Sequence, residues 1–244
     1  MRNKVRWHVG ISGWNYDDFN GLFYPKDLNS KKRLEFYSQK FNIVEINSSF
    51  YRIFKKDVFD NWAEKTPPEF KFTAKINRQF THKGSLNSPE NLCEWFFSSV
   101  AGLGEKLKVI LIQLPPRLNF EGAVLDGFLQ TIKIYTDKKL VLEPRNSTWF
   151  ADDVYKILSK YSVAFCLSNT GGKYPEKAVR TADFTYTRLH GSGELYNSSY
   201  TVEKLKDYKE KIEKLKTGEN YVFFDNTMHG YAVKNCIQFQ ELIN

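Results

Sequence analysis

The 244-residue sequence predicts a single α/β domain of the TIM type, a (β/α)₈ barrel. Eight short runs rich in β-branched and aromatic residues alternate with stretches of helical periodicity, which favours a parallel sheet covered by helices. The length matches one such barrel, typically about 250 residues. No strand-to-helix turn carries the G-x-G-x-x-G pattern of a dinucleotide-binding sheet. Closure into a barrel is therefore favoured over an open, doubly wound sheet.

The predicted strands follow one another along the whole chain. They are Trp7–Trp14, Ile43–Tyr51, Lys71–Asn77, Val109–Pro115, Lys139–Arg145, Val163–Asn169, Phe184–His190 and Tyr221–Asn226. Seven of them are followed by an amphipathic helical pattern. The exception is Thr170–Asp183, which carries two glycines and a proline without helical periodicity, so we expect an irregular sixth connection. No linker, repeat or low-complexity segment interrupts the chain, and we expect residues 1–244 to form one domain.

Composition predicts a folded, intracellular protein. Hydrophobic residues make up 41% and aromatic residues 16% of the chain, enough for a full core and unlike a disordered protein. No apolar run approaches the roughly 20 residues of a membrane helix, and no early segment looks like a secretory signal. Cys93, Cys166 and Cys236 form no C-x-x-C pair, so we expect buried structural thiols. We therefore expect a cytoplasmic protein with no membrane partner. The sequence carries no signal of oligomeric state.

Strand parity predicts where the polar side chains lie, because side chains along a strand alternate between the barrel interior and the helices. In the second strand the apolar Val44 and Ile46 should face the helices, which leaves Glu45 and Asn47 inside. The other strands turn these polar residues inward, mostly near their carboxyl ends: Ser12, Thr73, Lys75, Asn77, Gln113, Glu143, Arg145, Ser168, Arg188, His190 and Asp225. A barrel packed only for stability would hold branched apolar side chains there. We predict a ligand pocket at the carboxyl-end mouth, where barrel enzymes keep their sites.

The alternative interpretation is a network of ion pairs that satisfy one another. Glu45 could pair with Arg188, and Glu143 with Arg145 or Lys75. Burying polar groups without partners costs about 1–3 kcal/mol each, and more for charges. For any one pair the two interpretations are evenly balanced. The gathering of the whole set at one end of the barrel favours the pocket.

The basic side chains indicate an anionic ligand. Lys75, Arg145 and Arg188 supply fixed positive charge suited to a phosphate or carboxylate. Gly191–Gly193 follows the seventh strand and is either a backbone phosphate site or a flexible lid. The other candidate binding residues lie at neighbouring strand ends: Ser12, Trp14, Asn47, Gln113 and Asn226.

Four residues are candidates for acid–base chemistry. Glu45, Glu143 and Asp225 could act as general acids or bases, since basic neighbours and burial shift carboxyl pKa values. His190 is a candidate proton shuttle near neutral pH. Together with His229 these side chains would suit Zn²⁺ or Mn²⁺. However, the chain has only four histidines, in no H-x-H or H-E-x-x-H spacing, and basic residues crowd the same mouth. We therefore expect no metal and no cofactor.

A series of motifs, in order along almost the whole chain, resembles the YecE-like family (domain of unknown function 72). The matching runs are Gly10–Trp14 with Tyr24-Pro25, Val44–Arg52, Trp62 with Thr66–Pro68, Gln113–Pro116, Glu143–Arg145 through Trp149-Phe150, Thr181–Asp183 through Arg188–Gly191, and Phe224–Asn226. The resemblance implies a TIM-type barrel and names no substrate. Two residues depart from the pattern. Pro144 stands where an aromatic residue is expected, and Asp225 stands where asparagine is more usual, which puts an acid–base role for Asp225 in doubt.

Three functions are compatible with these observations. The first is an enzyme on a small phosphorylated or carboxylated substrate, for instance a metal-independent hydrolase, lyase or isomerase. The second is a metal-dependent, endonuclease-like enzyme acting on nucleic acid. The net charge of +8 supports it only weakly, because many of the lysines are interspersed with acids. The third is a non-catalytic sensor that uses the same pocket. The first is favoured.

Overall fold

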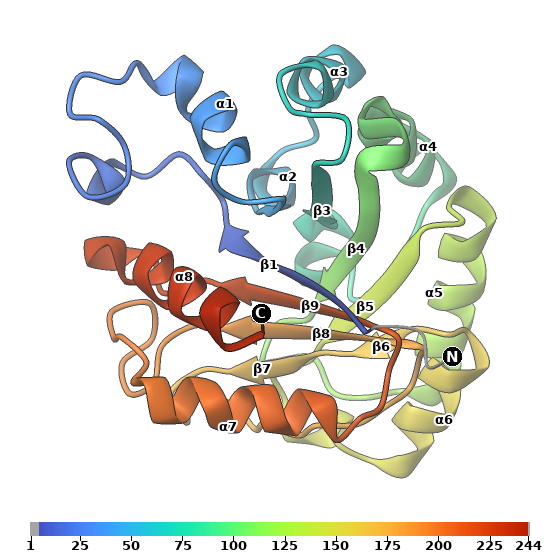
Figure 1. Ribbon diagram of the computed structural model, residues 1–244. Helices are drawn as coiled ribbons and strands as arrows, with labels where there is room; N and C mark the ends of the chain where they lie inside the picture. The colour runs from blue at the N-terminus through green and yellow to red at the C-terminus, as the bar shows by residue number, and fades with distance from the viewer. Residues whose placement is uncertain (1–4, 244) are drawn as a thin grey trace.

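The computed structural model describes residues 5–243, and its strands form one parallel sheet curled into a nearly closed barrel (Figure 1). The strands are β1 (Arg6–Ser12), β2 (Ile43–Ile46), β3 (Lys71–Lys75), β4 (Leu107–Gln113), β5 (Lys139–Glu143), β6 (Ala164–Phe165), β7 (Leu167–Asn169), β8 (Phe184–Leu189) and β9 (Glu219–Phe224). Their order in the sheet is β6-β5-β4-β3-β2-β1-β9-β8-β7. The predicted TIM-type fold is confirmed.

The sixth predicted strand is divided in two, and this division lets the barrel come round on itself. Its first half, β6, pairs with β5, and its second half, β7, pairs with β8. At the break, the N–H of Cys166 donates to the carbonyl of Leu142 on β5. The prediction of one continuous strand over Val163–Asn169 was therefore wrong in its middle, although the segment holds the expected place between its neighbours.

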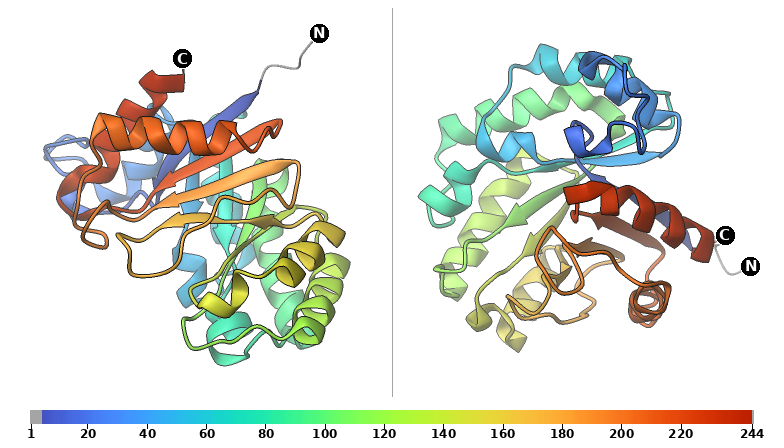
Figure 2. Two further views of the ribbon diagram at one scale, coloured as in Figure 1. Left: turned by 90° about the horizontal axis from the view of Figure 1, so that it is seen from below. Right: turned by 90° about the vertical axis from the view of Figure 1, so that its left-hand side faces the viewer.

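Helices cover the outside of the strands (Figure 2). The α-helices are α1 (Arg33–Ser38), α2 (Ser48–Tyr51), α3 (Lys56–Glu64), α4 (Glu90–Val100), α5 (Gly122–Tyr135), α6 (Asp152–Lys160), α7 (Val202–Glu213) and α8 (Tyr231–Ile243). Short turns of 3₁₀- or π-helix precede or follow several of them: η1 (Asp17–Phe19), η2 (Ser30–Lys32), η3 (Gln79–Lys83), η4 (Ala101–Lys106), η5 (Ser147–Trp149) and η6 (Met228–Gly230). Within the described residues no helix forms between β7 and β8, so the irregular sixth connection is confirmed. Between residues 5 and 243, no helix has the length and apolar character that crossing a bilayer requires.

Several strands end earlier in the chain than the sequence predicted. The second was expected to reach Tyr51, but β2 ends at Ile46 and Ser48–Tyr51 forms the short helix α2. The others stop one or two residues before the predicted ends, except that β7 ends at Asn169 as predicted. Side chains beyond the ends of the strands need not follow strict alternation. Arg145, His190 and Asp225 thus belong to loops that begin where strands end.

Two apolar layers fill the molecule. One lies between strands and helices and contains the outward-facing residues of the strands, such as Val44 and Ile46. The other fills the barrel interior, with Leu111, Val141 and Cys166 among its members. Cys93, Cys166 and Cys236 are all buried free thiols, as predicted. The interior layer ends where the polar side chains of the strand ends begin.

Candidate ligand site at the barrel mouth

Arg188, at the end of β8, is the centre of a buried ion cluster. Its guanidinium donates to Glu45 through Nη2 at 2.7 Å and through Nε at 3.1 Å. Nη1 lies 2.9 Å from Glu143 Oε2, and Nη2 lies 3.0 Å from Asp225 Oδ2. The residue is only 1% exposed. The bidentate pair with Glu45 orients the planar guanidinium, so Arg188 binds three carboxylates of its own chain.

Electrostatics keep this cluster ionised. Burial lowers the pKa of Arg188, but the carboxylates of Glu143, Glu45 and Asp225 outweigh burial and hold that pKa well above its ordinary value. Burial likewise raises the pKa of Glu143, but Arg188 and the hydrogen bond from His190 hold it well below the ordinary range. The ion-pair alternative from the sequence is therefore correct for Arg188, although Arg188 joins three acids rather than one.

Both candidate glutamates are surrounded by donors. Glu143 accepts hydrogen bonds from Gln113 Nε2 at 2.8 Å and Ser168 Oγ at 2.9 Å. Glu45 accepts hydrogen bonds from Ser12 Oγ and from the hydroxyl of Tyr186, each at 2.6 Å. With Arg188 included, all four carboxylate oxygens of Glu45 and Glu143 have partners. Hydrogen bonds thus fix the positions of both carboxylates.

Lys75 reaches the mouth from the end of β3. Its Nζ donates to Gln113 Oε1 at 2.7 Å and lies 4.0 Å from the centre of the Phe50 ring on α2. The residue is 8% exposed. Burial and the nearby Arg188 lower the pKa of Lys75 to about 7. Because Nζ has three donors and one acceptor partner among residues 5–243, Lys75 retains donors for a ligand.

Arg145 adds a second basic side chain to the mouth above β3 to β5. The Nη2 of Arg145 lies 3.9 Å from Glu143 Oε1, whereas its buried Nε has no hydrogen-bond partner among the described residues. The effect is visible at His82 on η3, which lies beside this region. Burial lowers the pKa of His82 to about 4, and the charges that add to this effect come from Lys75, Arg145, Arg117 and Arg78.

His190 lies between two carboxylates. Its Nε2 is 3.1 Å from Glu143 Oε1, and its Nδ1 is 2.9 Å from Asp225 Oδ2. Burial raises the pKa of Asp225, but Arg188 and the hydrogen bond with His190 bring it below its ordinary value. The ring of Tyr196 meets His190 edge-on, with the centroids 5.6 Å apart. Tyr196 thus covers the imidazole.

Tyr196 adopts a φ of 66°, a left-handed conformation that costs a residue with a Cβ about 1–2 kcal/mol. Its N–H donates to the carbonyl of His190. Strained residues of this kind cluster at functional sites. The sequence contained no signal for Tyr196, nor for Tyr16, whose hydroxyl donates to the carbonyl of Ser12 at 2.6 Å. Both lie in loops, where periodicity says nothing about direction.

The remaining predicted binding residues fall into three groups. Trp14 and Asn47 line a pocket of about 270 Å³ at the ends of β1 and β2, and the buried Oδ1 of Asn47 has no partner within residues 5–243. Asn226 lies apart from the ion cluster: its Nδ2 donates to the carbonyl of Ser198 and to Asn235 on α8. Ser12 and Gln113 serve the glutamates.

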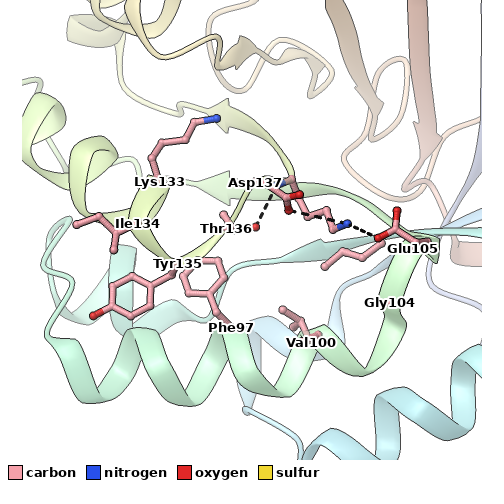
Figure 3. A pocket seen from close by; sticks show the side chains of 12 residues that line it. Phe97, Val100, Gly104, Glu105, Lys133, Ile134, Tyr135, Thr136 and Asp137 are labelled. Carbon is pink, nitrogen blue, oxygen red and sulfur yellow. Dashed lines mark hydrogen bonds and ion pairs between the residues drawn. The ribbon is translucent and has the colours of Figure 1, made fainter.

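The larger pocket in Figure 3 lies away from this chemistry. Its volume is about 490 Å³, and its lining comes from α4, η4, the first residue of β4, the end of α5 and the loop before β5, at the amino ends of these strands. Lys138 is paired there with Glu105 at 3.2 Å, and Phe97 stacks on Tyr135. The acids and histidines of residues 5–243 form no group of three arranged to hold a metal ion. His229, considered with them in the sequence, lies on η6.

Comparisons with known proteins find relatives along almost the whole chain. The family model described as "Protein of unknown function DUF72" matches residues 8–244. The UPF0759 protein YunF of Bacillus subtilis is 26% identical over 270 residues, covering 97% of this chain and 94% of that protein. The UPF0759 protein YecE of Escherichia coli is 30% identical over 108 residues, covering 44% of this chain and 37% of the relative. A solved DUF72 family protein from Thermotoga maritima superposes with a TM-score of 0.86 at 28% identity, covering 98% of this chain and 99% of the other.

Proposed function

This chain belongs to the family of proteins of unknown function DUF72, and we propose that it binds a small phosphorylated or carboxylated molecule at the carboxyl-end mouth of its barrel. The observation that carries the proposal is a pair of basic side chains with spare donors above β3 to β5: Lys75 Nζ has one hydrogen-bond partner, and the buried Nε of Arg145 has none among the described residues. Arg188 is engaged by three acids, so the ligand contacts are assigned to Lys75 and Arg145. Guanidinium and ammonium groups with spare donors bind phosphate and carboxylate well.

We assign the acid–base step of the proposed metal-independent enzyme to His190 and Asp225. Their side chains are in direct contact at the mouth. Glu143 and Glu45, also candidates from the sequence, have bonded oxygens and are better suited to fix the positions of His190 and Arg188. His190→Gln should abolish turnover of a bound metabolite and preserve its binding. A sensor would bind that metabolite without converting it in the unmodified protein.

Sulfate is the probe for the anion site, because its charge stays constant across neutral pH. We expect sulfate to raise the thermal midpoint of the unmodified protein, as a ligand of the folded state does. Lys75→Met and Arg145→Met should each lose most of this shift. Lys214→Met, which removes an exposed charge at the end of α7, should retain it.

The same titration has a pH signature. The cationic form of Lys75 predominates below its pKa of about 7, so sulfate should bind more tightly at about pH 6 than at about pH 8. Lys75→Met should flatten this dependence. Equal sulfate shifts in all three variants, or an affinity that rises with pH in the unmodified protein, would refute the proposed site.

A further inference from the structure

Another pocket lies outside the ion cluster and is lined by residues of α1, α2 and α3 and of the loops beside them. These three helices lie together on one side of the barrel (Figure 1). The volume of the pocket is about 500 Å³, within the range of sites for drug-sized ligands, about 300–1,000 Å³. It shares Trp14, Asn15 and Ser48 with the smaller pocket at the ends of β1 and β2. The two pockets therefore adjoin each other.

Aromatic rings form the apolar part of this pocket. Trp14 meets Trp62 of α3 edge-on at a centroid separation of 5.1 Å, and Phe54 meets Trp62 at 5.3 Å. Both tryptophans are only partly buried, so their rings remain accessible. Indole faces bind planar ligands by stacking, and stacking on a nucleobase is worth about 1–3 kcal/mol per base.

Three cations complete the lining, and no acid accompanies them. Lys31, Arg52 and Lys65 line the pocket, while aspartate and glutamate are absent from its lining among residues 5–243. The ion pairs of the described chain involve none of these three cations. Arg52 lies 4.2 Å over the ring of Phe54. Unpaired positive charge beside accessible aromatic rings favours a ligand that is both planar and anionic.

We propose that this pocket binds a nucleoside monophosphate, with its base on the indole rings and its phosphate on Arg52, Lys65 and Lys31. The side-chain amides of Asn15 and Asn61 offer donors and acceptors for the ribose or the base edge. The helix α2 separates this pocket from the anion site, since Phe50 faces Lys75 whereas Ser48 faces the pocket. The two sites are independent.

Calorimetric titration with AMP tests the proposal on the full chain. Adenosine lacks the phosphate and ribose 5-phosphate lacks the base, so each should bind at least about tenfold more weakly than AMP. The double variant Arg52→Ala/Lys65→Ala should weaken AMP binding by about tenfold or more, because it removes charges close to the phosphate. The matched control, Lys206→Ala/Lys214→Ala, removes two exposed lysines from the region of α7 and should leave AMP affinity unchanged.

Three further variants separate this pocket from its alternatives. Lys75→Met should leave AMP affinity unchanged, and loss of binding in that variant would place AMP at the barrel mouth and overturn the proposal. Trp62→Leu should weaken AMP binding while Trp62→Phe largely retains it. Absence of AMP binding, or an affinity that increases with the length of a single-stranded oligonucleotide, would also overturn a mononucleotide site.

Discussion

At the residue scale, the behaviour of Arg188 follows from its buried donors. The guanidinium supplies five N–H groups in one plane, and Glu45, Glu143 and Asp225 surround that plane. Lysine offers a single point charge and does not reproduce this geometry. Arg188 is therefore the residue whose loss leaves the most uncompensated buried charge.

We predict that Arg188→Met destabilises the protein by about 3–5 kcal/mol, because three carboxylates would lose their buried partner. Urea denaturation at neutral pH measures the change in unfolding free energy. Arg188→Lys should recover little of it. The control Arg180→Met removes an exposed ion pair with Asp183 and should cost less than about 1 kcal/mol. An Arg188→Met variant as stable as the Arg180→Met variant would contradict the role of the cluster.

Sequence parity found the members of this cluster and offered one of its pairs, Glu45 with Arg188, as an alternative to a ligand pocket. It placed Glu45, Glu143 and Arg188 at one end of the barrel because alternation fixes which face a side chain takes. Alternation carries no information on distance between strands, so it did not show that Arg188 contacts three acids at once. Tyr196 and His82 were missed because their direction is set by loop and π-turn geometry.

At the element scale, the divided sixth strand depends on one hydroxyl. The Oγ of Thr181 accepts the N–H of Phe165 at 2.8 Å and donates to the carbonyl of Val163 at 2.6 Å. These are backbone groups that β6 leaves unpaired on the side facing β8. The irregular connection after β7 thus returns a side chain to complete the hydrogen bonding of the barrel wall.

Thr181→Val keeps the shape of the side chain and removes both hydrogen bonds. We expect it to cost about 2 kcal/mol of stability, since an N–H and a C=O would be buried without partners. Thr131→Val is the matched control, because the Thr131 hydroxyl only donates to Gly127 within the helix α5, and it should stay within about 0.5 kcal/mol. Thermal unfolding of both variants gives the comparison. Equal costs would show that water replaces the Thr181 hydroxyl.

The order of strands and helices was predictable, and the interruption was not. Apolar runs such as Leu107–Gln113 report burial on both faces of a parallel strand, which is why all the strands were located. Cys166 reads as part of the same apolar run as Ala164 and Leu167. The break depends on Thr181, which lies fifteen positions further along the chain, beyond the reach of local periodicity.

At the scale of the whole molecule, the barrel interior carries charge at both ends. The mouth holds the Arg188 cluster. At the amino ends, Glu219 accepts a hydrogen bond from His8 at 2.7 Å and pairs with Lys139. Burial raises the pKa of Glu219, but the hydrogen bonds from His8 and Lys139 outweigh burial and bring it far below the ordinary value. An apolar layer separates the two charged ends.

This arrangement predicts sensitivity to acid. A carboxylate whose pKa is lowered by folding contributes stability above its unfolded pKa, and that contribution is lost as pH falls toward the folded value. Glu219→Gln should therefore lower the free energy of unfolding by about 2 kcal/mol near pH 7. Between about pH 5 and 3, the unfolding free energy of the variant should fall less steeply than that of the unmodified protein. Urea denaturation across this range measures both effects. Glu64→Gln, at an exposed position on α3, should follow the unmodified protein. If the unfolding free energy of Glu219→Gln fell with decreasing pH as steeply as that of the unmodified protein, the prediction would be wrong.

The ion cluster around Arg188 also makes the folding of distant parts of the chain interdependent. Glu45 comes from the second strand of the sequence, whereas the arginine and its other two acids come from the second half. A fragment that ended between β4 and β5 would have to bury a carboxylate without its cation, and the complementary fragment would keep its cation with fewer acids. Neither half-barrel gains a complete set of charges until the other is in place. Two half-barrels taken from different relatives should therefore form a stable barrel only if together they supply this full set of charges.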